Sequence, residues 1–122
     1  KALLPQGQSV FNKIVFSLYG QKDIRDALEV LKRKDLVLVG QETDVCIAQS
    51  AIDLVNAGYR VWVADDATAS PGPHHEAGLR RMRSAGVTVS GIKGIYYEWL
   101  RDVPTAIAVE TAVNKTPSDL TL

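Results

Sequence analysis

Residues 36–64, LVLVGQETDVCIAQSAIDLVNAGYRVWVA, contain the pattern that decides the fold. The unbroken apolar run 36–39 is typical of a strand buried on both faces, as in a parallel sheet. A helix is expected over 44–57 because apolar residues recur there at helical spacing, and Gly58 suits its C-terminal end. The apolar stripe of this helix is formed by Val45, Ala48, Ile52 and Val55, widened by Ala51 and Leu54. Residues 59–64 predict the next strand, which completes a strand–helix–strand unit.

The same alternation continues on both sides of this unit. Further strands are predicted over 10–17 and 87–89, a loop over 65–73, and helices over 23–34, 75–85 (closed by Gly86) and 94–101. Strands that alternate with helices of this length predict an α/β fold, a three-layer α/β/α Rossmann-like parallel sheet with helices on both faces. The chain is interpreted as a single domain, 1–122, whose signals weaken after Val103 and whose residues 114–122 are expected to form a flexible tail.

Composition limits the classes of partner. The 122 residues include 14 basic and 14 acidic side chains, a formal net charge of zero, which argues against nucleic-acid or membrane binding through bulk charge. No apolar run approaches the ~20 residues of a membrane helix. A single cysteine excludes a disulfide within the chain, and together with the lack of a leader it favours a reducing, cytoplasmic compartment. The chain begins with Lys1 rather than Met, so we expect a segment upstream of it.

The single cysteine, Cys46, is predicted at the start of the helix that follows a buried strand. Thr43 is a good N-cap candidate and Asp44 would lie in the first turn, which puts Cys46 at about the third helical position. A helix N-terminus stabilises a thiolate, and its free N–H groups can hold the oxyanion formed when sulfur attacks a carbonyl. The alternative is that Cys46 is a small apolar residue packed in the core.

The wider pattern resembles a known family. Residues 37–70 resemble the signature of the isochorismatase-like cysteine hydrolases, which include nicotinamidases and carbamoyl-amide hydrolases. The matching elements are Gly40, Thr43 three residues before Cys46, the pair Gly58-Tyr59, and Asp66-Ala67 after the next strand. Residues 74–89, HHEAGLRRMRSAGVTV, also resemble the family, and the likeness extends to about Arg101.

Upstream, residues 11–20, FNKIVFSLYG, resemble the segment with the family's catalytic lysine, in the form found in the isochorismatase-domain-containing branch. The lysine corresponds to Lys13. Read from the residues alone, Lys13 is either a solvated lysine at a strand edge or, given its apolar neighbours, a functional group.

The resemblance implies an Asp-Lys-Cys triad that hydrolyses a small amide or related C–N bond. Cys46 would attack the carbonyl to form a thioester-type intermediate, and Lys13 would favour the thiolate. The backbone N–H groups of Glu42 and Cys46 would form the oxyanion hole, and the Gln41–Glu42 bond corresponds to a position where the family often has a cis peptide. No cofactor or metal is implied, and the partners would be a small-molecule substrate and further copies in a homo-oligomer. The weaker pocket candidates are Phe16, Tyr19, Gln41 and Thr43.

The triad aspartate has no counterpart in this sequence. In the family it precedes the lysine on the first strand, but residues 1–12, KALLPQGQSVFN, contain no acidic side chain. The N-terminal strand of the family's fold is therefore expected to be missing from these 122 residues. A longer protein, a second chain that supplies the aspartate, or a relative that has lost catalysis would each explain this, and we favour the first. The 122 residues alone are expected to have no hydrolase activity or a severely reduced one. The alternatives are a non-catalytic oligomeric interaction module with Cys46 packed, and a flavodoxin-like ligand binder.

Other polar and aromatic groups have simpler interpretations. His74 and His75 are adjacent and therefore do not face each other on a helix, which favours contacts at the helix start over a metal site. No glycine pattern of a nucleotide site is present. Three arginines are expected on a solvated helix face, and three aromatic residues pack locally or form a subunit interface. These are Arg80, Arg81 and Arg83, and Tyr96, Tyr97 and Trp99.

Overall fold

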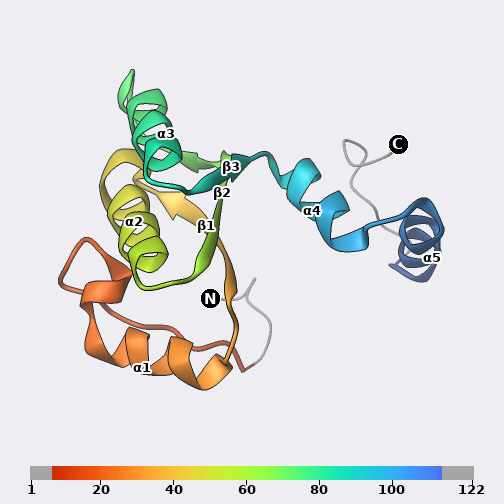
Figure 1. Ribbon diagram of the computed structural model, residues 1–122, viewed down its shortest axis with the longest axis horizontal. Coiled ribbons are helices and arrows are strands. Elements are labelled where there is room, and N and C mark those ends of the chain that lie inside the picture. The colour runs from red at the N-terminus through yellow and green to blue at the C-terminus, as the bar shows by residue number, and fades with distance from the viewer. Residues whose placement is uncertain (1–6, 114–122) are drawn as a thin grey trace.

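The computed structural model describes residues 7–113, so the expected tail at 114–122 lies outside the described residues. In this range strands and helices alternate along the chain (Figure 1). The strands are β1 (Asp35–Gln41), β2 (Arg60–Ala69) and β3 (Thr88–Ser90). The helices are η1 (Leu18–Gly20), α1 (Lys22–Leu31), η2 (Thr43–Ile47), α2 (Ala48–Asn56), α3 (His74–Ser84), α4 (Ile92–Leu100) and α5 (Val103–Val113).

The three described strands form one sheet in the order β1-β2-β3, and both pairs are parallel. The predicted α/β class with a parallel sheet is therefore confirmed. Helices α2 and α3 lie side by side on one face of the sheet (Figure 1). Alternate residues of β2, Val61 and Val63, are buried under them, and α4 contacts β2 as well.

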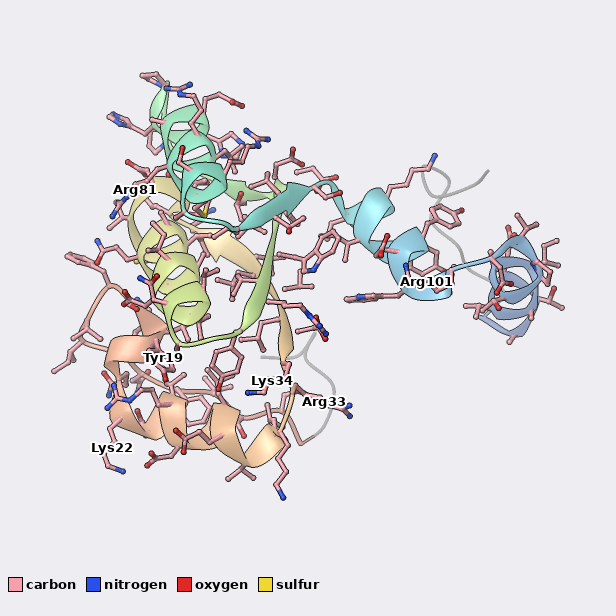
Figure 2. All side chains as sticks on the ribbon, viewed as in Figure 1. Tyr19, Lys22, Arg33, Lys34, Arg81 and Arg101 are labelled. Atoms are coloured by element: carbon pink, nitrogen blue, oxygen red, sulfur yellow. The ribbon has the colours of Figure 1, made fainter. Side chains whose placement is uncertain are left out.

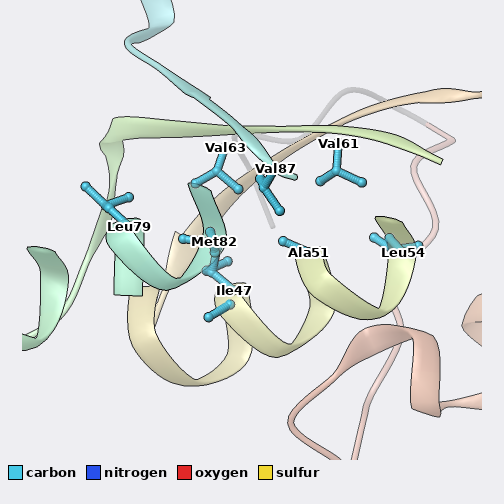
Figure 3. Packing of buried hydrophobic residues seen from close by; sticks show 9 residues of the cluster. Ile47, Ala51, Leu54, Val61, Val63, Leu79, Met82 and Val87 are labelled. Carbon is cyan, nitrogen blue, oxygen red and sulfur yellow. The ribbon is translucent and has the colours of Figure 1, made fainter. Parts of the chain in front are cut away.

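The core lies between this face of the sheet and α2 and α3 (Figure 3). Its members are Ile47, Ala48, Ala51, Leu54, Val61, Val63, Leu79, Met82 and Val87. The predicted stripe of the α2 helix is partly wrong, because Val45, Ile52 and Val55 are only half-buried. The buried face is centred on Ala51 and is therefore rotated by about one residue.

The predicted strand over 10–17 is wrong. These residues run through a coil and a series of bends into η1. A strand needs backbone hydrogen bonds to a neighbouring strand, and among the described residues this segment pairs with none of β1, β2 and β3. The segment is held instead by the Lys13 ammonium group, which donates hydrogen bonds to the carbonyl oxygens of Val15 and Phe16. Its β-branched and aromatic residues are therefore largely exposed, with Phe16 at 61%.

Two further predictions about the strands need correction. The apolar run 36–39 is not buried on both faces, since Val39 is 53% exposed. The predicted loop 65–73 begins too early, because β2 continues to Ala69. After a shift in register between Leu38 and Gly40, the ends of the two strands pair again, with Gly40 opposite Thr68.

The helix boundaries show the effect of individual residues. The helix predicted over 23–34 ends at Leu31, because Lys32 adopts a left-handed conformation with φ of 51°. Helix α5 was missed, since its apolar residues surround the axis and show no helical period. Its start has a local cause, because the Asp102 carboxylate accepts a hydrogen bond from the Thr105 N–H at 2.8 Å. The predictions for α3, β3 and α4 are confirmed to within two residues at each end.

Candidate active site

The candidate site lies where β1 ends and the chain turns into η2. Gly40 has φ of 117°, and the Gln41–Glu42 peptide bond is cis, as the family resemblance implied. The next five residues, Thr43–Ile47, form a π-helical turn that leads directly into α2. Cys46 is the fourth residue of this turn and is half-buried. The thiol therefore sits at the carboxyl edge of a parallel sheet, the usual place for ligand sites in this architecture.

Thr43 is not the N-cap of this turn. Glu42 occupies that position, and it makes no side-chain capping hydrogen bond. The Glu42 carbonyl accepts hydrogen bonds from Val45 N at 3.3 Å and from Ile47 N at 3.0 Å. Thr43 is instead fully buried, and its Oγ1 lies 2.9 Å from Nδ1 of His75 on α3. The prediction failed because a residue 32 positions away engages the hydroxyl.

Lys13 and Cys46 come together across a separation of 33 residues. The Lys13 Nζ atom lies 3.6 Å from Cys46 Sγ. It also donates hydrogen bonds to the carbonyl oxygens of Val15 and Phe16, both at 2.9 Å. Residues 13–16 therefore curve around the ammonium group. The fold thus brings a thiol and an amino group from distant parts of the sequence into contact.

The segment that follows Lys13 is anchored on α2, the helix that η2 leads into. The Leu18 N–H donates to Ser50 Oγ at 2.9 Å, and Ser50 is buried. Tyr19 packs edge-on against Tyr59, with ring centroids 6.3 Å apart, between α1 and α2 (Figure 2). Tyr19 therefore has a packing role, whereas Phe16 and Gln41 are exposed.

A polar network that the sequence analysis missed lies beside the cysteine turn. Ser70 Oγ donates to Asp44 Oδ1 at 2.6 Å and accepts from Asp44 N at 3.4 Å. His74 Nδ1 lies 3.7 Å from Asp44 Oδ2. The hydrogen bond from Ser70 is the main reason why the pKa of Asp44 is lowered, with a smaller contribution from His74. The two histidines thus make contacts at the start of α3, as expected.

We predict that Asp44 contributes to stability at neutral pH but not in strong acid. Its pKa is lower in the folded protein than in the unfolded chain, so the contribution is present above the unfolded value of about 4. It is lost as the pH falls through the folded pKa. Urea midpoints of the wild type and Asp44→Asn should therefore differ at pH 6 and converge towards pH 2.5. Asp53→Asn, an exposed change on α2, should show a smaller difference at pH 6. A difference for Asp44→Asn that grows in acid would contradict the prediction.

Other features of the molecule lie away from this site. A groove of about 1320 Å³ is lined by residues of β1, β2 and α4, among them Val37, Trp62 and Ile95, but by neither Lys13 nor Cys46. Between residues 7 and 113 no cluster of three or more His, Cys, Asp or Glu side chains could hold a metal ion. In the same range, no helix combines the length and the apolar character needed to cross a membrane.

The predicted surface groups behave in two ways. Arg80, Arg81 and Arg83 are exposed on α3, as expected for a solvated face. On α4, Tyr96 and Tyr97 pack edge-on with centroids 5.3 Å apart, whereas Trp99 is 68% exposed. Trp99 is therefore the aromatic residue of this helix that is available for a contact with another molecule.

The fold and the Lys13–Cys46 pair define an α/β protein with a thiol and an ammonium group at the carboxyl edge of a parallel sheet. A family model described as isochorismatase domain matches residues 1–93. The chain therefore belongs to the isochorismatase domain family.

Individual relatives agree with this assignment. The chain is 37% identical over 94 residues to isochorismatase family protein 2A of Dictyostelium discoideum, a match that covers 75% of this chain and 47% of that protein. A nicotinamidase structure from Bacillus subtilis matches with 30% identity and a TM-score of 0.60, covering 64% of this chain and 44% of that one.

A third match concerns the fold alone. The YcaC structure from Escherichia coli, described as an octameric hydrolase of unknown specificity, has a TM-score of 0.70 at 22% identity, covering 81% of this chain and 51% of that one. The chain spans about half the length of the curated relatives it matches.

Proposed function

We propose that this chain carries the nucleophile of a cysteine hydrolase that cleaves an amide or related C–N bond in a small molecule. The observation that carries the proposal is the 3.6 Å distance between Lys13 Nζ and Cys46 Sγ at the carboxyl edge of the sheet. Family membership supports hydrolysis, and the similarity to a nicotinamidase supports an amide as the scissile group.

In this proposal the reaction proceeds through a thioester. The Cys46 thiolate, stabilised by the Lys13 ammonium group, attacks the carbonyl carbon, and the carbonyl π electrons move to oxygen. The backbone N–H groups of Glu42 and Cys46, both at the start of the helical turn, donate to that oxyanion. The C–N bond then breaks, the amine leaves with a proton, and water hydrolyses the thioester to the acid and free thiol.

The proton transfers require a group besides Cys46 and Lys13. We propose an aspartate that lies outside these 122 residues, which takes the proton from the Cys46 thiol and passes it to the leaving amine. It then accepts a proton from the attacking water and returns it to the thiolate that leaves the thioester. The short coverage of the relatives is consistent with this assignment. Asp44 is not chosen, because its carboxylate is engaged by Ser70 at 2.6 Å.

The substrate pocket is proposed to include the exposed side chains of Phe16 and Gln41, which flank Lys13 and Cys46 along the chain. Tyr19 and Thr43 would support this pocket from behind, since Tyr19 packs on the core and Thr43 is buried. A planar substrate would suit the aromatic face of Phe16. The proposal includes a cytoplasmic location, because a thiol nucleophile must remain reduced.

The alternative proposal is a non-catalytic interaction module that forms homo-oligomers. It draws support from apolar residues exposed beyond the sheet, such as Trp99 at 68% and Ile107 at 55%. The octameric assembly described for YcaC supports self-association in this fold. Self-association is compatible with either function, so the reactivity of Cys46 separates the two.

The test is the rate at which iodoacetamide alkylates Cys46 at pH 7, quantified by mass spectrometry of the Cys46 peptide. We expect Cys46 to react faster than glutathione, and Lys13→Ala to slow it about tenfold because the thiolate loses its neighbouring positive charge. Lys13→Arg should retain most of the rate. Lys22→Ala, which removes an exposed lysine paired with Asp26, is the matched control. A thiol that reacts only after unfolding would favour the interaction module.

A further inference from the structure

The Thr43–Ile47 turn, which contains Cys46, is held by hydrogen bonds from residues that lie outside the turn. Its N-cap residue, Glu42, provides no side-chain hydrogen bond. An uncapped helix start leaves N–H groups that need partners. Ser70, the residue after β2, is the partner of one of these N–H groups: its hydroxyl accepts from Asp44 N at 3.4 Å and donates to Asp44 Oδ1 at 2.6 Å. A serine hydroxyl has one proton and two lone pairs, so it can make both bonds at once.

A second support comes from α3. The Thr43 hydroxyl is buried and meets Nδ1 of His75 at 2.9 Å. About one helical turn further along α3, Gly78 packs closely against the backbone of Thr43 and Asp44. A Cβ atom added to Gly78 would lie 2.7 Å from Asp44 Cα and 3.0 Å from the Thr43 carbonyl carbon. The backbone of α3 therefore touches the turn directly, and His75 is anchored next to that contact.

We propose that Ser70 and His75 are positioning residues, which hold the Thr43–Ile47 turn so that Cys46 Sγ stays within reach of Lys13 Nζ. The inference rests on the proposed function of Cys46. Both residues act on the first two positions of the turn, and Cys46 follows two residues later. Neither contacts the sulfur among the described hydrogen bonds, so their effect passes through the backbone.

The positioning role has a physical basis in the two backbone hydrogen-bond patterns, π-helical and α-helical, that the Thr43–Ile47 turn can adopt. A π-type turn is a rare arrangement that is frequent at functional sites, and the commoner α-helical pattern is the alternative that we expect when its supports are lost. Such a change rotates the later residues of the turn about the helix axis, which would move Sγ away from the ammonium group. A displacement of about 1 Å at a reacting centre can lower a rate by about two orders of magnitude.

The experiment compares alkylation of Cys46 by iodoacetamide at pH 7 in the intact protein and in paired variants. Ser70→Ala and His75→Ala are each expected to slow alkylation about tenfold. Ser70→Thr keeps the hydroxyl and His75→Asn keeps a hydrogen-bonding group for Thr43, so both should restore most of the rate. Ser84→Ala is the matched control, because it removes a side-chain hydrogen bond on the exposed part of α3, to Arg80 O at 3.1 Å.

The direction of the change separates positioning from general destabilisation. A variant that merely unfolds more often exposes the thiol, which alters the rate in proportion to the unfolded fraction seen by circular dichroism. A slower rate in a fully folded variant supports positioning, and the two positions give independent results if one variant does not fold. If Ser70→Ala and His75→Ala were both alkylated as fast as Ser84→Ala, the positioning role would be overturned.

The failure of this inference is distinguishable from the failure of the proposed function. If wild-type Cys46 reacts quickly and neither alanine variant differs from Ser84→Ala, positioning alone is wrong. If wild-type Cys46 reacts no faster than glutathione, the proposed nucleophile is wrong and the positioning role falls with it.

Discussion

Replacing Cys46 by serine is expected to lower the proposed hydrolysis of small amides at least about a thousandfold, the usual consequence of removing an essential nucleophile. Serine has nearly the same shape as cysteine, so the half-buried position beside Lys13 tolerates the change. A hydroxyl is far less acidic than a thiol, and an ammonium group 3.6 Å away does not ionise it at neutral pH. The serine variant is therefore expected to fold and to bind the proposed substrate without forming the acyl intermediate.

The measurement is the release of ammonia from a panel of small aromatic and aliphatic amides, with the protein as it occurs in the cell. Cys46→Ala should be as inactive as the serine variant, while Ser84→Ala should retain wild-type turnover. The folded state of each variant is checked by its urea midpoint. If Cys46→Ser retained more than a tenth of the wild-type rate, the nucleophile would be another group. A wild type that is inert towards every amide would favour the interaction module.

Replacing Leu54 by alanine lowers the free energy of unfolding by about 2 to 5 kcal/mol, the range measured for buried leucine truncations. Leu54 is completely buried, and it lies near the end of α2, on the side that faces Val61 of β2 (Figure 3). The change removes apolar area from the core and leaves a cavity that close-packed neighbours fill only in part. A small domain has only about 5 to 15 kcal/mol of stability, so a large part of it is lost.

The matched control for this prediction is Leu31→Ala at the end of α1, where the side chain is 61% exposed. That change should alter the free energy of unfolding by less than about 1 kcal/mol. Urea unfolding followed by circular dichroism measures both variants. Similar losses for the two leucines would contradict the assignment of the core to the α2 side of the sheet.

Much of the fold could be predicted because its signals are local. The apolar runs and the helical period between residues 36 and 64 are properties of short segments. Gly58 and Gly86 have φ of 92° and 88°, which few other residues adopt readily, and both were expected at the ends of helices. The pairing of Cys46 with Lys13 was expected from the family resemblance rather than from spacing, and the structure places Lys13 Nζ 3.6 Å from Cys46 Sγ.

Other features depend on partners that are distant in sequence. Residues 10–17 have the composition of a strand, yet they pair with none of the strands described within residues 7–113, and Lys13 contacts Cys46 instead. The Thr43 hydroxyl is a good capping group, but His75 binds it instead. The extension of β2 to Ala69 depends on the shift in register opposite Gly40. In each case a tertiary contact outweighs a local preference that is worth only about 1 kcal/mol.

The sequence by itself determined the class of fold, the position of the nucleophile candidate at a strand end, and the family. These follow from apolar periodicity, from glycines with unusual backbone angles, and from spaced residues along one stretch of chain. Only the tertiary structure decided which groups surround Cys46. Ser70 binds Asp44, 26 residues away in the sequence, and His75 contacts Thr43, 32 residues away. These contacts form only when β2 and α3 pack against the cysteine turn. Hydrogen bonds between distant segments depend on the packing of whole elements, and no local pattern encodes them.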